Sequence, residues 1–77
     1  MHLEIITPEK NIYSGEVSLV NIPGSDGSFG ILENHAPIIS TLKAGTIKVV
    51  ENNKELFFDV KGGVIEMSNN KIIVLAE

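Results

Sequence analysis

The side chain best suited to chemistry in this sequence is His35, since an imidazole can take up or release a proton near neutral pH. A nucleophilic site would need a serine or threonine beside it and an acid behind its ring, and no serine here lies in a nucleophile-elbow sequence. A metal site would need three or four ligands at short spacing, and only Glu33 is close. The sequence therefore predicts no catalytic residue, metal or cofactor. It favours a structural or interfacial His35 with a ring nitrogen bonded to nearby backbone, and a chemical role remains the alternative.

A second candidate site is a glycine-rich stretch in which Gly24, Gly27 and Gly30 recur at a spacing of three. Phosphate-binding loops are rich in glycine, but this stretch lacks their Gly-Lys-Ser/Thr ending, and no helix pattern follows it. Glycine at every third position suits a tight loop that reaches positive φ more than once and lets another surface approach the backbone. Pro23 and Pro37 stiffen the two ends. These five residues are predicted to shape a contact loop.

Two side chains at the tip of this loop bear on what it contacts. Asp26 adds negative charge where an anion would bind, which argues further against a phosphate site. Phe29 is either tucked into the edge of the fold or presented to a partner, and the sequence leaves both open. The carboxylates Glu33, Asp59 and Glu66 show no pairing and indicate a solvated surface.

The elements that must hold this loop are β-strands. Apolar residues alternate in short stretches separated by turn signals roughly every eight to ten residues, and no window repeats them at helical spacing. Turns are predicted at residues 7–10, 52–53 and 69–70, where asparagine or proline favours them. Residues 62–63, both glycine, are predicted to form a bulge or a sharp bend between two strands. The expected strands are 3–7, 12–22 with a bend at Gly15, 28–32, 36–42, 46–51, 56–61, 64–67 and 72–76.

This pattern predicts one all-β domain over residues 1–77, a small antiparallel sandwich of two sheets with about eight to ten short strands, or a flattened barrel. A chain of this length buries only about 60% of the surface that it exposes when unfolded, so a partner could add to its stability. The sequence leaves open which side of residues 12–22 faces the core. The core is expected to comprise Leu3, Ile5, Val17, Leu19, Ile47, Val49, Leu56, Phe58, Val60, Val64, Ile72 and Val74.

Charge and composition narrow the class of partner. The 77 residues carry a net charge of −4, and all six basic residues are lysine. A nucleic-acid binder needs a basic face, and phosphate clamps and arginine fingers need arginine, so nucleic acid is excluded as a partner. The sequence has no cysteine for disulfides or thiolate ligands, no signal-peptide pattern, and no apolar run near the ~20 residues of a membrane span.

The stretch between Pro23 and Pro37 reads Pro-Gly-x-x-Gly-x-x-Gly-Ile-Leu-x-x-His-Ala-Pro, and it resembles the signature of the epsilon subunits of F-type ATP synthases. Residues 7–10 and 13–17 resemble the first turn and second strand of that family. Residues 42–45, 62–66 and 74–77 resemble its later strands. The similarity covers the whole chain and implies a β-sandwich of two antiparallel sheets, as the residues themselves do.

The resemblance implies a non-catalytic central-stalk subunit, held by the gamma subunit and resting on the c-ring, that helps to couple proton flow to ATP synthesis. It implies peripheral attachment at the cytoplasmic face of the bacterial inner membrane without membrane insertion, and the isolated chain is expected to be a monomer. By position, the c-ring would be faced by Ser25, Asp26, Gly27, Ser28 and Phe29. The gamma subunit would be faced by Thr7, His35 and Ser40.

One departure from the family and two rival classes remain. Most members continue after the position of Glu77 into two α-helices, which block rotation in the hydrolysis direction and carry an ATP-binding motif. The sequence ends there, so it predicts neither device, and its initial Met without a tag favours a natural single-domain form over a trimmed one. The first rival, a β-sandwich module that binds a protein, sugar or peptide, would need an aromatic platform, and the chain has one tyrosine and three phenylalanines. The second, a small hydrolase, lacks a nucleophile constellation.

Overall fold

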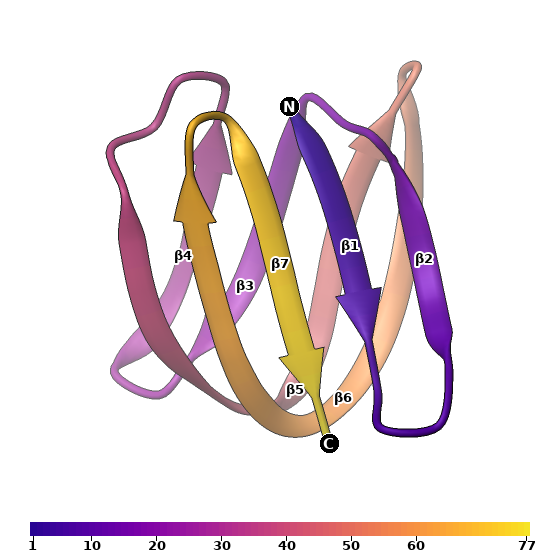
Figure 1. The fold of residues 1–77 in the computed structure, drawn as a ribbon, viewed down its shortest axis with the longest axis vertical. Helices are drawn as coiled ribbons and strands as arrows, with labels where there is room; N and C mark the ends of the chain where they lie inside the picture. Colours follow the sequence, from indigo (N-terminus) through magenta and orange to yellow (C-terminus); the bar gives the residue numbers. More distant parts are fainter.

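The computed structural model describes residues 1–77, which form seven β-strands (Figure 1). The count is lower than expected because 36–42 and 46–51 join into one long strand, and 56–61 and 64–67 join into another. The expected strand 12–22 is divided in two at residues 17–18. The strands are β1 (His2–Ile6), β2 (Asn11–Glu16), β3 (Leu19–Gly24), β4 (Gly27–Leu32), β5 (Ile38–Glu51), β6 (Lys54–Ser68) and β7 (Lys71–Ala76).

All seven strands belong to one sheet, in the order β2-β1-β7-β6-β5-β3-β4. Neighbouring strands are antiparallel except for β1 and β7, which pair in parallel with Leu3 opposite Ile72 and Ile5 opposite Val74. The all-β prediction is confirmed. The prediction of two antiparallel sheets was wrong in two respects, because the sheet is single and it is mixed.

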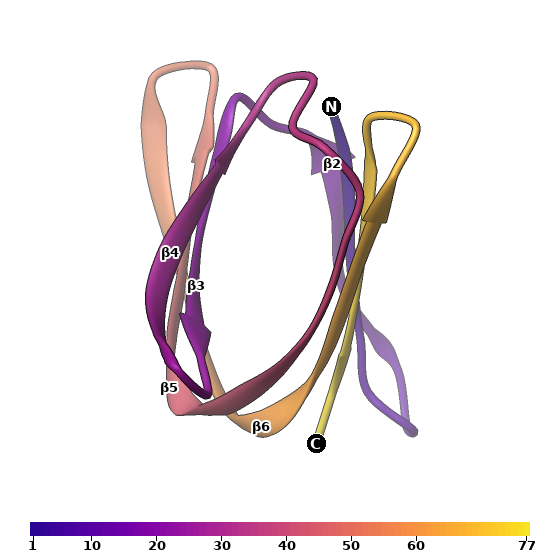
Figure 2. The ribbon, with the colours of Figure 1, turned by 90° about the vertical axis from the view of Figure 1, so that its left-hand side faces the viewer.

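The sheet makes a sandwich by folding over on itself. β5 and β6 each run through both layers, and Figure 2 shows them curving from one layer to the other at the lower end of the molecule. At this bend Gly62 and Gly63 have φ values of 148° and 143°, which L side chains rarely adopt. The predicted sharp bend is therefore present. Pairing continues in register across it, with Leu42 opposite Gly63 and Gly45 opposite Val60.

The bend changes which side chains of β6 face the core. Val60 is buried before it, whereas Ile65 and Met67 are buried after it and Val64 is 41% exposed. The prediction that Val64 lies in the core was wrong, because the bend at the two glycines shifts the two-residue alternation of the strand by one position. The other eleven residues predicted for the core are buried or partly buried. Leu19, Leu56 and Phe58 are partly buried, and the buried residues include Leu3, Ile5, Val17, Val60, Ile47, Val49, Ile72 and Val74.

β3 supplies core residues that the sequence did not assign. Val20 and Ile22 are buried on the inner face of this strand. Ile31 of β4 and Leu42 of β5 are buried as well, and all four belong to the same apolar cluster. The hairpin of β3 and β4 is therefore anchored in the core by its own inward side chains.

Two hairpins end in two-residue asparagine turns, as predicted. The φ values are 49° and 64° at Asn52 and Asn53, and 50° and 61° at Asn69 and Asn70. Asparagine tolerates this left-handed conformation because its short polar side chain can hydrogen-bond locally. The turns connect β5 directly to β6 and β6 directly to β7.

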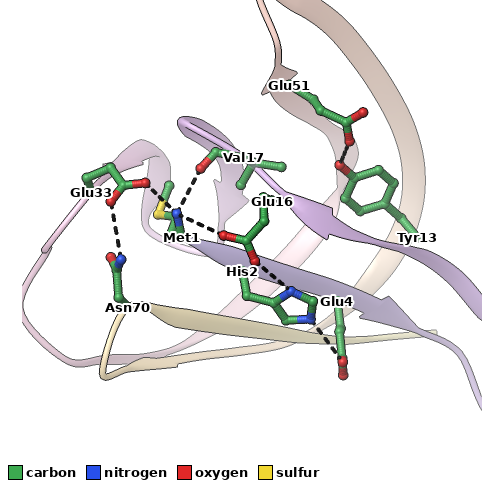
Figure 3. Close-up of polar contacts among 9 residues, drawn as sticks. All are labelled: Met1, His2, Glu4, Tyr13, Glu16, Val17, Glu33, Glu51 and Asn70. Carbon is green, nitrogen blue, oxygen red and sulfur yellow. Dashed lines mark hydrogen bonds and ion pairs between the residues drawn. The ribbon is translucent and has the colours of Figure 1, made fainter.

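A polar contact ties the edge strand β2 to the end of β5. The Tyr13 hydroxyl donates a hydrogen bond to the Glu51 carboxylate (Figure 3), and its ring centroid lies 5.3 Å from that of Phe58. Burial, together with the bond to Glu51, raises the pKa of Tyr13 to about 12. Because the folded-state pKa lies above the ordinary value of about 10, the protonated hydroxyl stabilises the fold fully below about pH 10. This stability is lost as the pH rises through about 12.

Candidate partner-binding surfaces

The glycine-rich stretch is a β-hairpin rather than a long loop. β3 and β4 pair as far as Gly24 opposite Gly27, and only Ser25 and Asp26 form the turn. Gly27 has a φ of 131°, and the space where a Cβ would lie is open. The expectation of repeated positive φ was wrong, since Gly24 and Gly30 are paired strand residues without it.

The two prolines at the ends of the stretch lie in different surroundings. Pro23 is buried, and a Cβ on Gly45 would come within 2.8 Å of its ring, so this proline packs against the bend of β5. Pro37 is exposed just before β5 begins. Only the first of them braces the hairpin by packing.

The hairpin tip is fastened to β5. The Ser25 N–H donates to the Thr41 carbonyl oxygen at 3.0 Å, and the Thr41 hydroxyl donates to Ser25 Oγ at 2.7 Å. Phe29 is half-buried against the core and close to Gly24, where an added Cβ would lie 2.7 Å from its ring, so it is tucked into the edge of the sandwich. The exposed tip is made of four residues, Ser25, Asp26, Gly27 and Ser28.

The three residues predicted to face the gamma subunit lie apart. Figure 1 shows the β4–β5 loop, with His35, at the upper end of the sandwich and the β1–β2 turn, with Thr7, at the lower end. Thr7 closes its turn by accepting from the Lys10 N–H at 3.2 Å and donating to the Lys10 carbonyl at 3.1 Å. Ser40 is half-buried and donates to the carbonyl oxygen of the next residue at 3.2 Å. His35 is exposed, and its Nδ1 lies 2.7 Å from the Ala36 carbonyl oxygen, so the predicted bond to nearby backbone is present.

An apolar furrow crosses the outer face of the sheet between these two ends. The side chains of Ile39, Leu75 and Val64 are 78%, 56% and 41% exposed. Three neighbouring hollows make up the furrow, because the first two share Ile39 and Glu66 and the last two share Ile6 and Leu75. The central hollow has a volume of about 390 Å³. We call this surface the outer furrow, and its central residues are Ile6, Ile39, Val64, Glu66, Ile73 and Leu75.

The outer furrow was not predicted from the sequence, although the sequence contains a signal for it. Residues 72–76 are apolar on both faces, which is typical of a strand covered on both sides. The upper end of the furrow reaches Pro37 and Ser68, and its lower end reaches Thr7 and Pro8. Thr7 and the loop of His35 therefore lie at opposite ends of one continuous surface.

A network of polar contacts holds the β4–β5 loop (Figure 3). One carboxylate oxygen of Glu33 accepts a hydrogen bond from the α-ammonium of Met1, and the other accepts one from Asn70 Nδ2 at 3.2 Å. Asn70 Oδ1 accepts a hydrogen bond from the Asn34 N–H at 3.0 Å. The ammonium of Met1, and after it the amide of Asn70, lower the pKa of Glu33 below its usual value.

This pKa shift predicts how the loop responds to acid. A carboxyl with a lowered folded-state pKa contributes stability above its unfolded value of about 4.3 and loses it as the pH falls through the folded value. Glu33→Gln is therefore expected to lower the melting temperature at neutral pH, and the difference from the parent should vanish in stronger acid. Melting curves across this pH range test it, with Glu9→Gln as a control at an exposed glutamate that makes no ion pair. A difference that persists unchanged in strong acid would contradict the prediction.

The structure brings no three histidine, aspartate or glutamate side chains into an arrangement that could hold a metal ion. His2 lies between two carboxylates (Figure 3). Its Nδ1 is 3.1 Å from Glu16 Oε2, and its Nε2 is 3.1 Å from Glu4 Oε2. There is no helix long and apolar enough to cross a membrane. The hairpin tip and the outer furrow are two exposed surfaces on different parts of the sheet.

Residues 1–77 match the family model described as ATP synthase, Delta/Epsilon chain, beta-sandwich domain. The chain belongs to this family. The resemblance seen in the sequence is thereby confirmed over its full extent. The epsilon chain is a non-catalytic subunit of ATP synthase, in agreement with the prediction that this chain is not an enzyme.

Bacterial epsilon chains are similar in sequence. The ATP synthase epsilon chain of Desulforamulus reducens is 45% identical over 75 residues, which cover 97% of this chain and 57% of that relative. The epsilon chain of Caulobacter vibrioides is 38% identical over 77 residues, which cover 100% of this chain and 90% of that relative. The chain therefore spans little more than half the length of one relative and most of the other.

Solved structures share the fold. A chain of the Euglena gracilis mitochondrial ATP synthase, in a structure of OSCP, F1 and the c-ring, matches with a TM-score of 0.89 at 19% identity, covering 96% of this chain and 48% of that chain. A chain of the Tetrahymena thermophila mitochondrial ATP synthase, in a structure of the central stalk and c-ring, matches with a TM-score of 0.82 at 17% identity, covering 97% and 61%. The delta/epsilon β-sandwich is thus the fold of this chain.

Proposed function

We propose that the chain is a rotor subunit in the central stalk of a proton-translocating F-type ATP synthase, where it links the gamma subunit to the c-ring and helps to couple proton flow to ATP synthesis. The observation that carries this proposal is the presence of two separate exposed surfaces, a polar hairpin tip and an apolar furrow, on one folded sheet. Membership of the delta/epsilon family supports it. A subunit that connects two partners needs a separate surface for each.

The gamma subunit is proposed to occupy the outer furrow. Contiguous exposed apolar surface rimmed by polar residues marks protein–protein contacts. Glu66 is the one charged residue lining the central hollow, so covering it removes little charge from water. Thr7 and the loop of His35, which the family resemblance assigns to gamma, flank the two ends. One partner lying along the furrow would reach both.

The hairpin tip is proposed to rest on the c-ring. Figure 1 shows the tip at the lower end of the sandwich, the end opposite to the loop of His35. The two hydrogen bonds between Ser25 and Thr41 fasten it to β5, and Thr41 lies opposite Val64 of the outer furrow in the sheet. A force on the tip would therefore reach the furrow through paired strands rather than through a free loop.

The shape of the tip is expected to matter more than its charge. Gly27→Ala places a side chain at a φ of 131°, at a conformational cost of about 1–2 kcal/mol, and should displace the turn. Asp26→Asn keeps the shape and removes an exposed charge worth at most about 1 kcal/mol. In reconstituted membranes Gly27→Ala should lower proton-driven ATP synthesis, while Asp26→Asn leaves it nearly unchanged. The opposite ranking would mean that the contact is electrostatic.

The same proposal predicts where the chain lies in the cell and what its oligomeric state is. The chain would be held at the cytoplasmic face of the bacterial inner membrane through its partners, without inserting into the bilayer. In isolation it would be a monomer, because its docking surfaces serve other proteins. Washed membranes from cells that lack the gamma subunit should then retain none of the chain, and retention would contradict attachment through gamma.

A further inference from the structure

Asn70 holds the β4–β5 loop through both the nitrogen and the oxygen of its amide, and Figure 3 shows the contact of Asn70 with Glu33. Its Nδ2 donates to the Glu33 carboxylate at 3.2 Å, and its Oδ1 accepts from the Asn34 N–H at 3.0 Å. This amide orientation is the one in which both contacts are favourable, since the reverse would set donor against donor and oxygen against carboxylate. The grip therefore needs one donor and one acceptor side by side, which an asparagine provides.

The loop has little else to keep it in place. All five of its residues, 33–37, are exposed, so packing contributes little. Its other recorded ties are the Met1–Glu33 ion pair and the bond from the His35 N–H to the Leu32 carbonyl at 3.2 Å. Segments with few buried contacts open locally at low free-energy cost. The contacts to Asn70 thus make up a large share of what orders the loop.

The loop that Asn70 holds leads directly into the outer furrow, because Pro37 at its end lines the upper hollow. The upper hollow of the furrow is lined by Pro37 and Ile38 from the loop side and by Met67 and Ser68 from the β6–β7 side. Asn70 lies two residues beyond Ser68, in the turn between β6 and β7. Ile38 and Met67 are paired in the sheet, so the amide acts on the loop that leads into this hollow rather than on the hollow itself.

We propose that Asn70 is a positioning residue for partner binding, which holds the loop of His35, at the upper end of the outer furrow, in the conformation that the gamma subunit recognises. This inference rests on the proposed function of the furrow. Ordering a loop before binding removes that entropic cost from the association step. A chain without the grip should bind gamma more weakly and still fold.

The substitution Asn70→Gly tests the proposal, because glycine accepts the φ of 61° at this position while removing the amide. Asn53→Gly is the matched control, with a φ of 64° in the same kind of asparagine turn and no recorded side-chain contact. In the 77-residue chain, Asn70→Gly should speed amide hydrogen exchange at Asn34 by about tenfold. It should weaken the affinity for purified gamma by a similar factor. Asn53→Gly should do neither.

A double substitution that exchanges the acid and the amide between positions 33 and 70 distinguishes positioning from a simple loss of stability. Asn70→Asp keeps the acceptor for Asn34 but sets a carboxylate against Glu33, so it should also weaken gamma binding. Adding Glu33→Gln supplies an amide donor to that carboxylate and should recover most of the affinity. Failure of this recovery, or unchanged exchange at Asn34 in Asn70→Gly, would overturn the positioning role. If no form of the chain binds gamma, the parent included, the proposed function itself fails.

Discussion

Gly63→Ala is expected to destabilise the protein by about 3 kcal/mol or more, the largest effect among the glycines of this fold. An added Cβ would lie 2.2 Å from the Leu75 carbonyl oxygen and 3.0 Å from Ala76 Cα, which are backbone atoms of the neighbouring strand. The φ of 143° is unfavourable for alanine in addition. A domain of this size has a total stability of roughly 4–12 kcal/mol, so a large part of it would be lost.

Gly27→Ala is the matched control for this prediction. Its φ of 131° is also unfavourable, but an added Cβ meets nothing within 4 Å. The control should therefore show the conformational cost alone, about 1–2 kcal/mol. Equilibrium urea unfolding of both variants gives the comparison. Equal losses at the two sites would mean that β6 and β7 move apart easily at the bend, and that the sandwich does not depend on their close approach there.

The second large effect is expected at the outer furrow, where Ile39→Asp should lower the affinity for the gamma subunit at least ~100-fold. Ile39 is 78% exposed and belongs to two of the three hollows, so the furrow depends on it while the core does not. A carboxylate there would have to be desolvated beside Glu66 when gamma binds. The melting temperature should change little, because the side chain is already in water.

Phe57→Asp controls for both charge and exposure in this experiment. Phe57 is 60% exposed on the half of β6 that belongs to the other layer, and the substitution adds the same negative charge. Binding of gamma to the two variants can be compared by calorimetry with purified proteins. If Phe57→Asp abolishes binding and Ile39→Asp does not, the gamma subunit docks on the opposite layer and the assignment of the outer furrow is wrong.

The sequence predicted those features that depend on one residue and its immediate neighbours. The asparagine turns were correct because the preference of asparagine for the left-handed region is local. The bond from His35 to nearby backbone was correct for the same reason, since the ring reaches the adjacent carbonyl. Alternation within one straight strand was also predictable, and Ile47 and Val49 are buried as expected.

The features that the sequence did not predict depend on how distant segments meet. Val64 was assigned to the core because alternation was counted straight through the two glycines, whose bend reverses it. The single folded sheet was missed because β5 and β6 change layers without ending. The hydrogen bonds from Asn70 to the loop join residues 36 or more positions apart, and no local sequence pattern indicates such contacts. The outer furrow likewise brings Ile6 beside Leu75.

The parallel pairing of β1 with β7 has a consequence for how the chain is made. Of the seven strands of this sheet, β1 leaves the ribosome before the others, and it finds its neighbour on one side at once, since β2 follows it directly. Its other neighbour is β7, which is made after the six other strands of the sheet, and β1 lies between β2 and β7. The nascent chain therefore cannot complete its sheet until residue 76 has emerged, and until then one side of β1 is open to other chains. Contacts that join the two ends of a sequence also form slowly. During synthesis this β-sandwich is therefore exposed to aggregation until β7 has paired with β1.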